Sequence, residues 1–256
     1  MELNGRVALV TGGGGGLGAA TVRHLVDVGM KVVVFDRAQE AADRVAAEVG
    51  ADAVAVAGDT TSDDDVAAAV AAAQELGVLS LVVNVAGGGV HAGRTVNRDL
   101  SPHPMDAFTT TMDMNATGTF NVSRIACAAM ATNEPDEDGQ RGVVVNTASI
   151  AGLEGQTGQV AYAAAKAAIL GMTLPLARDL APLGIRVCAI APGTMGTPLL
   201  MGAPESITAP LVESIIFPKR MGKPSEFGLL VESIAKNPYL NGENIRLDAA
   251  LRFPPK

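Results

Sequence analysis

The sequence predicts an α/β fold with a parallel β-sheet of about seven strands and helices on both faces of the sheet. Short β-branched runs alternate with longer alanine-rich segments along the chain. The runs are apolar throughout, as expected for parallel strands that are covered on both sides. Hydrophobic residues make up 48% of the 256 residues, which suffices for a large core. This pattern is typical of a single Rossmann-type, doubly wound domain over residues 1–256.

The apolar runs predict the strands in this order: Val7–Val10, Val32–Phe35, Ala53–Ala57, Leu81–Asn84, Val143–Thr147, Arg186–Ala191 and Ile245–Leu247. Segments with helical spacing lie between them. In Ser62–Leu76, for example, Ser62 can cap a helix and Asp65 follows three residues later.

Three segments are expected to leave the body of the sheet. Residues 87–104 and 133–142 are rich in glycine, proline, asparagine and charge, and residues 192–224 are rich in proline. Proline disrupts helix interiors, so the last segment should hold no long regular helix. We expect residues from about 194 to 224 to form a lid over the substrate.

Composition argues against several classes of function. A net charge of −8 repels phosphate backbones and anionic lipids, so no nucleic-acid partner is expected. No apolar stretch approaches the roughly 20 residues of a membrane span, so no membrane partner is expected. The first predicted strand begins almost at the N-terminus, leaving no room for a signal sequence before it, which favours the cytoplasm.

The cysteines and histidines do not form a metal-binding pattern. Cys127 and Cys188 lack metal-ligand spacing and are expected to be buried, apolar and reduced. His24, His91 and His103 are spread along the chain, and none pairs with a second histidine or a cysteine at zinc-binding spacing. We therefore expect no catalytic metal.

A glycine run between the first strand and the first helix predicts a dinucleotide site. Backbone N–H groups in such a turn can approach a pyrophosphate, and the helix N-terminus favours its charge. Two glycine spacings fit the run Gly12–Gly16 with Gly18, so the register stays open at this point. A flexible polyglycine loop is the alternative.

Asp36 closes the second strand where a carboxylate can accept hydrogen bonds from the ribose of adenosine. Because a carboxylate there repels a 2′-phosphate, the cofactor is predicted to be NAD rather than NADP. Arg37 beside it weakens this choice, since arginine can bind that phosphate. Asp59 and Thr60 could contact the adenine or simply cap the next helix.

Small residues follow the fourth strand as Asn84-Val85-Ala86-Gly87 and would let a flat cofactor cross the strand end.

Tyr162 and Lys166 form the candidate catalytic pair. Their spacing of four residues on the predicted helix 159–177 places both side chains on one face. A phenol is a weak base at neutral pH, and a nearby ammonium should lower its pKa. Ser149, just past the fifth strand, could hold the substrate oxygen against the phenol. A solvated Tyr–Lys pair and a serine in a turn are the alternatives.

In combination these residues resemble the short-chain dehydrogenase/reductase family. Its pattern matches Thr11-Gly12-x-x-x-Gly16-x-Gly18, Asn84-x-Ala86-Gly87, Asn115, Ser149, Tyr162-x-x-x-Lys166 and Pro192-Gly193. The resemblance selects Gly12, Gly16 and Gly18 as the glycine register. It implies that Tyr162 is the general acid/base, that Ser149 orients the substrate, that Lys166 binds the nicotinamide ribose and lowers the tyrosine pKa, and that Asn115 anchors a water. Val85 departs from the asparagine common at its position.

Further segments, among them Asn146-Thr147-Ala148-Ser149 and Gly196-Thr197-Pro198-Leu199-Leu200, resemble the type-2 3-hydroxyacyl-CoA dehydrogenases. The resemblance implies a homotetramer that oxidises 3-hydroxyacyl-CoA, and often hydroxysteroids. It also implies NAD contacts at Gly15, Leu17, Asp36, Asp59, Thr60, Val85 and Met195, beside the motif residues Asn84, Ala86, Tyr162, Lys166 and Pro192.

Two other functions remain open from the sequence alone. A hydroxysteroid or other bulky-alcohol dehydrogenase would use the same catalytic residues under a differently shaped lid. A non-catalytic NAD-binding sensor or scaffold is the alternative of another class. The presence of Ser149, Tyr162 and Lys166 together argues against a pure binder.

Overall fold

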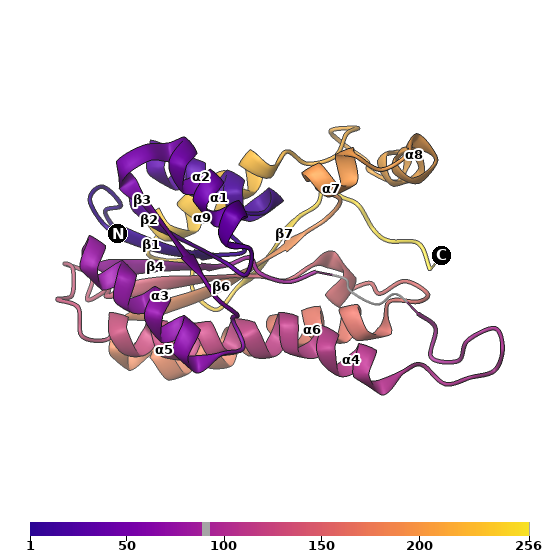
Figure 1. Cartoon of the computed structure of the whole chain (residues 1–256), viewed down its shortest axis with the longest axis horizontal. Helices are drawn as coiled ribbons and strands as arrows, with labels where there is room; N and C mark the ends of the chain where they lie inside the picture. The colour runs from indigo at the N-terminus through magenta and orange to yellow at the C-terminus, as the bar shows by residue number, and fades with distance from the viewer. Residues whose placement is uncertain (89–92, 256) are drawn as a thin grey trace.

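A seven-stranded parallel sheet forms the centre of the computed structural model, which describes residues 1–88 and 93–255 (Figure 1). Its order is β3-β2-β1-β4-β5-β6-β7. The predicted strands are confirmed with bounds within two residues of those expected: β1 (Val7–Thr11), β2 (Lys31–Asp36), β3 (Ala53–Ala57), β4 (Leu79–Asn84), β5 (Gly142–Thr147), β6 (Ile185–Pro192) and β7 (Asn244–Leu247).

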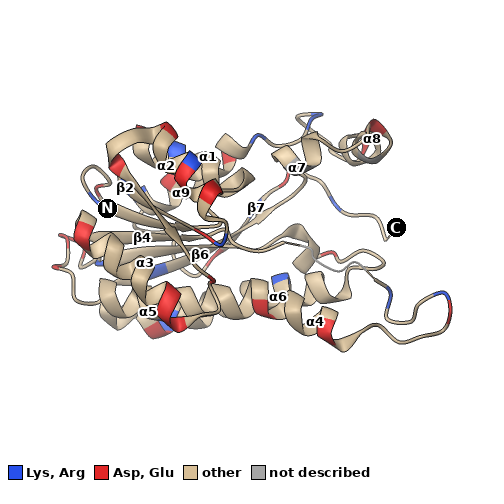
Figure 2. Ribbon diagram, viewed as in Figure 1, with Lys and Arg blue, Asp and Glu red and all other residues tan. Residues whose placement is uncertain are grey.

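Helices cover both faces of the sheet, which confirms the doubly wound α/β fold (Figure 1). One face packs against α1 (Gly16–Asp27), α2 (Gln39–Val49) and α9 (Pro224–Lys236). The helices α3 (Asp63–Leu76), α5 (Gly118–Met130) and α6 (Val160–Leu180) cover the other, and α4 (Met105–Met112) extends that layer. Charged residues lie mainly on helices and loops (Figure 2).

The strands are apolar throughout because each contributes to two cores. In β1, Ala8 and Val10 face the core beneath α1 and α9, while Val7 and Leu9 face the core beneath α3 and α5. Successive strand side chains point to opposite faces, so a strand buried on both sides must be apolar at every position. This is the physical basis of the uninterrupted runs in the sequence.

The chain reverses its direction across the sheet between β1 and β4. It leaves β1 towards β2 and β3 and then returns to place β4 on the other side of β1. The connections that follow β1 and β4 therefore lead away to opposite sides. They open a crevice at the carboxyl ends of these two strands, where sheets of this kind usually bind their ligands.

Ser62 caps α3 as predicted: its hydroxyl accepts a hydrogen bond from the Asp65 amide at 3.3 Å. The first helix begins at Gly16, so the end of the glycine turn is helical.

The expectation of no membrane-length apolar stretch needs correction. Among the described residues, the helical stretch Val160–Leu183 is long and apolar enough to cross a membrane by length and composition. The helix packs against the sheet instead: Ala165, Ile169, Leu170 and Ala177 are buried. It also buries Lys166.

The proline-rich segment forms two short helices, α7 (Pro198–Met201) and α8 (Glu205–Glu213), and no long one, which agrees with the expectation. They project beyond the carboxyl ends of the strands, and the C-terminal segment runs beneath them (Figure 1). Residues 89–92 of the predicted irregular segment 87–104, His91 among them, lie outside the described residues.

Candidate active site

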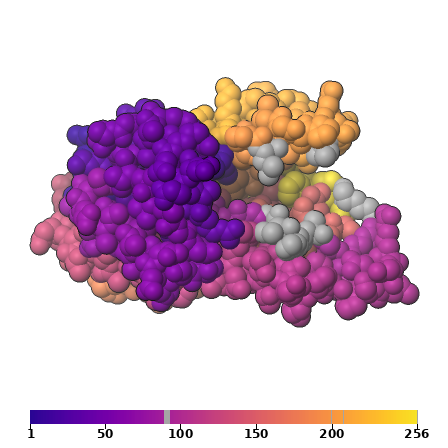
Figure 3. Space-filling view, viewed as in Figure 1, coloured from indigo at the N-terminus to yellow at the C-terminus, as the bar shows by residue number. Residues whose placement is uncertain are grey.

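A cleft with a cavity of about 830 Å³ opens at the carboxyl ends of β1 and β4. In the space-filling view a hollow separates the projecting segment that carries α7 and α8 from the helical layer below it (Figure 3). The cavity is lined by these predicted residues: Gly12, Gly15, Gly16, Leu17, Gly18, Asp36, Asp59, Thr60, Val85, Ala86 and Tyr162. Residues distant in the sequence are therefore brought to one site.

The glycine turn is closely packed on itself. Gly12 has φ of +62°, which side-chain-bearing residues rarely adopt. A Cβ atom on Gly18 would lie 2.1 Å from the Gly12 carbonyl oxygen, and one on Gly16 would lie 2.8 Å from the Thr197 Cβ. The turn therefore depends on glycine at the register that the family resemblance selected.

Asp36 holds the end of β2 beside this turn. Its carboxylate accepts hydrogen bonds from the Gly14 amide and the Ala38 amide, both at 3.0 Å. A carboxylate has about four acceptor positions, so further donors can still bind it from the cavity. This arrangement fits recognition of a pair of ribose hydroxyls.

Arg37 forms an ion pair with Asp59 at the cavity, with 3.6 Å between the guanidinium and the carboxylate. Asp59 also accepts hydrogen bonds from the amide and hydroxyl of Thr61. These Thr61 contacts, with Arg37, hold the Asp59 pKa below its usual value. Asp59 thus stabilises the turn before α3 and lines the cavity, so both interpretations offered for it remain compatible with its position.

Thr11 shapes the floor of the cleft. Its hydroxyl accepts hydrogen bonds from the amides of Val85 and Ala86, each at 3.0 Å. Asn84 points away from the cavity and donates hydrogen bonds to Ser123 and to the neighbouring strand at Asn146. The Asn84 side chain therefore ties strands and helix together behind the floor rather than lining it.

Tyr162 and Lys166 lie on the inner face of α6, as their spacing predicted. The Lys166 Nζ atom is 5.7 Å from the centre of the Tyr162 ring and donates a hydrogen bond to the Thr147 carbonyl at 2.9 Å. Only 3% of Lys166 is exposed, so the pair is not the solvated one offered as the alternative. Burial lowers the pKa of Lys166 to about 8.

The predicted lowering of the tyrosine pKa is wrong for this structure. Burial of the phenol raises the pKa of Tyr162 above its usual value, and a polar contact with the Ser149 hydroxyl only partly opposes that rise. The Lys166 ammonium is directed to a backbone carbonyl instead of the phenol. The phenol is therefore protonated at neutral pH, the state needed to donate a proton.

Ser149 lies at the start of a single 3-10 turn, η3 (Ile150–Gly152), directly after β5. Its hydroxyl accepts a hydrogen bond from the Ala151 amide at 3.1 Å, which leaves the hydroxyl proton available to another acceptor. A Cβ on Gly152 would lie 2.8 Å from the backbone of α6 at Ala167, so this turn is seated directly on the helix that carries Tyr162.

Asn115 lies in a π-helical turn, η2 (Asp113–Thr117), between α4 and α5. Such turns are frequent at functional sites because they redirect side chains. The fully buried Asn115 amide donates to the carbonyls of Thr111 and Gly88 and accepts from the Gly88 amide. A Cβ on Gly87 would lie 2.5 Å from the Asn115 oxygen and 3.4 Å from Lys166 Nζ, so these groups are neighbours.

Besides Asn84, five predicted residues do not line the cavity: Asn115, Ser149, Lys166, Pro192 and Met195. Lys166 lies behind Tyr162, Pro192 is buried at the end of β6, and Met195 packs beneath Gly222. Other lining residues were not predicted, among them Gly14, Arg44, Gly58, Thr61, Asp113, Thr197 and Pro198. Thr197, just before α7, packs against the glycine turn at Gly16, and its place in a motif after β6 was the one available signal.

The fold, the glycine turn and the Ser149–Tyr162–Lys166 arrangement together define a dinucleotide-dependent dehydrogenase site. Residues 6–207 match the family model for short chain dehydrogenases. The chain therefore belongs to the short-chain dehydrogenase family and is an oxidoreductase.

Individual relatives match over nearly the whole chain. A 3-hydroxyacyl-CoA dehydrogenase type-2 of Drosophila melanogaster is 49% identical, covering 97% of this chain and 98% of that protein. The crystal structure of 3-hydroxyacyl-CoA dehydrogenase type-2 from Mycobacterium avium has a TM-score of 0.96 and 50% identity, covering 98% of each chain. A 3-ketoacyl-(acyl-carrier-protein) reductase from Brucella melitensis, complexed with NADH, has a TM-score of 0.84 and 28% identity, covering 97% of this chain and 98% of that chain.

Proposed function

We propose that this protein is an NAD-dependent dehydrogenase that interconverts a 3-hydroxyacyl-CoA and a 3-oxoacyl-CoA. The observation that carries the proposal is the placement of the Tyr162 phenol in the dinucleotide cleft, with Ser149 beside it and Lys166 behind it. The substrate follows from the two type-2 3-hydroxyacyl-CoA dehydrogenases that are about half identical to this chain.

The residues of the cleft fit NAD. The Cβ-free turn Gly12–Gly16 and the N-terminus of α1 would hold the pyrophosphate, and Asp36 would accept hydrogen bonds from the adenosine ribose. Arg37 pairs with Asp59, and Arg44 donates to the Gly14 carbonyl, while the Asp36 carboxylate lines the cavity and would repel a 2′-phosphate. The NADH bound by the Brucella reductase supports the same cofactor.

Side chains of the protein would carry out the proton transfer of the reaction. Tyr162 would donate its proton to the oxygen of a ketone and take one from an alcohol, while the Ser149 hydroxyl holds that oxygen. A bound nicotinamide supplies the hydride donor or acceptor. Lys166 would stabilise the phenolate left behind, and Asn115 would hold a water that returns the proton.

Oxidation requires the phenolate, which burial disfavours in the chain by itself. We propose that positive charge in the loaded cleft, from Lys166 and the oxidised cofactor, lowers the Tyr162 pKa for this direction. The cofactor-free chain is accordingly poised for proton donation.

The decisive experiment is an NADH-formation assay over a panel of 3-hydroxyacyl-CoA thioesters and hydroxysteroids, run with NAD and with NADP. We expect turnover of the thioesters with NAD. Preferential turnover of hydroxysteroids would assign the protein to the bulky-alcohol class instead. Cofactor binding without turnover of any compound would favour a sensor, and preference for NADP would contradict the role given to Asp36.

A further inference from the structure

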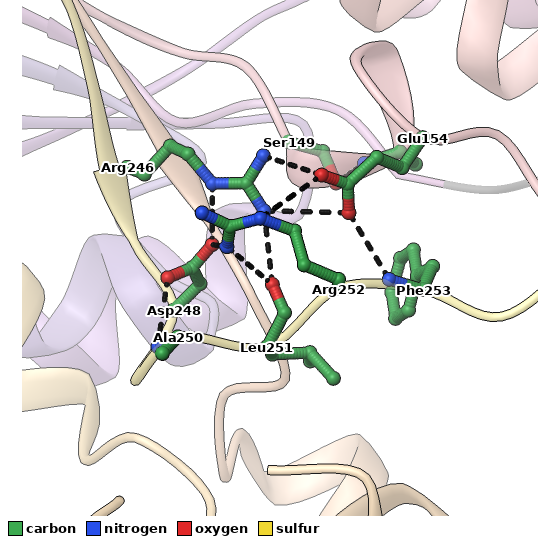
Figure 4. Close-up of polar contacts among 9 residues, drawn as sticks. Ser149, Glu154, Arg246, Asp248, Ala250, Leu251, Arg252 and Phe253 are labelled. Carbon is green, nitrogen blue, oxygen red and sulfur yellow. Dashed lines mark hydrogen bonds and ion pairs between the residues drawn. The ribbon is translucent and has the colours of Figure 1, made fainter. Parts of the chain in front are cut away.

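A network of ion pairs joins the loop after Ser149 to the C-terminal segment (Figure 4). Two guanidinium groups, of Arg246 and Arg252, lie between the carboxylates of Glu154 and Asp248. Arg246 contacts Glu154 at 2.8 Å and Asp248 at 2.6 Å, and Arg252 contacts them at 3.4 Å and 3.1 Å. Each carboxylate is therefore shared by both arginines.

Backbone groups of the C-terminal segment complete the network. Glu154 also accepts a hydrogen bond from the Phe253 amide at 3.0 Å, and both arginines donate to the Leu251 carbonyl. The hydrogen bond from Arg246 holds the Glu154 pKa below its usual value, so the carboxylate stays charged. The Glu154 and Arg246 side chains are only about a quarter exposed, which makes this network stronger than a surface pair.

Glu154 is linked directly to the turn that carries Ser149. The Glu154 amide donates to the Ile150 carbonyl at 2.8 Å, closing the turn over η3. On one side that turn rests against α6 through Gly152. On the other side it is held through Glu154 by the C-terminal segment, so the position of Ser149 relative to Tyr162 is determined from both sides.

The lid meets the same segment. Ile150 of the turn, Leu251 of the C-terminal segment and Ile215 of the lid form one small buried cluster. The Phe217 amide also donates to the Ala249 carbonyl at 3.3 Å. The C-terminal segment thus lies between the turn carrying Ser149 and the lid and contacts both.

We propose that Glu154 is a positioning residue, which acts through its ion pairs with Arg246 and Arg252 to hold Ser149 in register with Tyr162. This inference rests on the proposed function for its kinetic readout. A shift of about 1 Å in a group that orients the substrate can lower turnover by one to two orders of magnitude.

The test compares Glu154→Gln, Arg252→Gln and the double variant, using the best substrate of the panel. We expect each single variant to lower kcat about tenfold while NADH binding, followed by cofactor fluorescence, stays within about twofold. Because both changes break the same contact, the double variant should lose little more than one of them. The matched control is Glu48→Gln, which removes the exposed pair with Arg23 between α1 and α2 and should leave kcat unchanged.

A readout independent of the substrate separates this inference from the proposed function. Amide exchange of residues 149–155 in the NADH-bound protein should accelerate in Glu154→Gln and stay unchanged in Glu48→Gln. Unchanged exchange in Glu154→Gln would overturn the inference whether or not any substrate is turned over. Equal losses in kcat and NADH binding, or single effects that multiply in the double variant, would also overturn it.

Discussion

At the scale of single residues, the site depends on burying a cation. Lys166 is inside the core of α6 and the sheet, without a carboxylate partner among the described residues, and burial lowers its pKa to about 8. Such a group costs stability in its charged form and is retained at a site where the charge acts on a neighbour. Its neighbour is Tyr162, at the edge of the cleft.

Replacing Lys166 with methionine should therefore raise stability while lowering activity. The native pKa of about 8 lies below the unfolded value of 10.5, so the native state binds its proton less tightly than the unfolded chain does. The cost of the buried charge is present in full below pH 8 and disappears as pH rises from 8 to 10.5. After allowing for the lost hydrogen bond to Thr147, we expect Lys166→Met to gain about 2 kcal/mol in urea unfolding at pH 7.

The stability gain of Lys166→Met should shrink as the pH is raised towards 10.5. At neutral pH the kcat of this variant should be at least about 100-fold lower than that of the unmodified protein. Lys236→Met is the matched control, because this lysine is exposed on α9 and its loss should change stability by less than about 0.5 kcal/mol. A lower stability of Lys166→Met at pH 7 would contradict the energetic role of burial.

Residue-scale predictions from the sequence succeeded where spacing alone placed the groups. Tyr162 and Lys166 had to share a helix face, and Asp36 had to end a strand. The raised pKa of Tyr162 could not be predicted, because enclosure of the phenol depends on segments distant in the sequence. Met195 and Pro192 were expected at the cofactor; both are buried and do not line the cavity.

At the scale of elements, the turn between β1 and α1 determines how closely a cofactor can approach. Ala at position 18 would place its Cβ 2.1 Å from the Gly12 carbonyl oxygen, a backbone atom that cannot move without opening the turn. We expect Gly18→Ala to lower stability by about 2 kcal/mol or more and to weaken NADH binding at least about tenfold, measured by thermal unfolding and fluorescence titration.

Gly171→Ala provides the matched control within α6. Open space surrounds this exposed helical position, so the alanine should stabilise the helix by about 0.5–1 kcal/mol without affecting NADH binding. If Gly18→Ala and Gly171→Ala had the same effect on stability and on NADH binding, the steric explanation for glycine at position 18 would be ruled out.

Residues 194–224 form the segment that we expect to act as a substrate lid. It contains two short helices with proline at or near their starts. It contacts the glycine turn through Thr197, and the cluster around Ile215 joins it to the turn after Ser149 and to the C-terminal segment. We propose that it closes over bound substrate and predict slower amide exchange across 194–224 when cofactor and substrate analogue are both bound. Identical exchange in the free and bound forms would exclude a closing lid.

The strands were predictable because burial on both faces leaves an uninterrupted apolar signature. The π-helical turn at Asn115 was not, since its sequence has no feature that distinguishes it from an ordinary helix. The ties between loops, such as Thr11 to Val85 and Glu154 to the C-terminal segment, join residues far apart in the chain. Local pattern cannot identify such contacts.

At the scale of the whole molecule, the sheet positions both halves of the site. The cofactor half follows β1 to β4. The catalytic half follows β5 and includes the first turns of α6, so one edge of one sheet brings the two halves together. The cores on the two faces hold this edge in place, while lid and C-terminal segment extend beyond it (Figure 1).

We expect the protein to form a homotetramer, by resemblance to its family. Apolar side chains remain about half exposed on α5 and α6, including Phe120, Val160 and Leu174, and burial between subunits would remove that apolar surface from water. Light scattering coupled to size exclusion should give four times the chain mass of 26.0 kDa. A monomer mass at micromolar concentration would contradict this expectation.

The most direct test of the mechanism is the rate of NADH formation by Tyr162→Phe with the best 3-hydroxyacyl-CoA substrate. Phenylalanine keeps the ring and the packing of α6 but removes the oxygen that exchanges the proton. We expect a fall in kcat of about 1,000-fold or more, with NADH binding within about twofold of the unmodified protein. Turnover that persists within about tenfold would show that another group moves the proton.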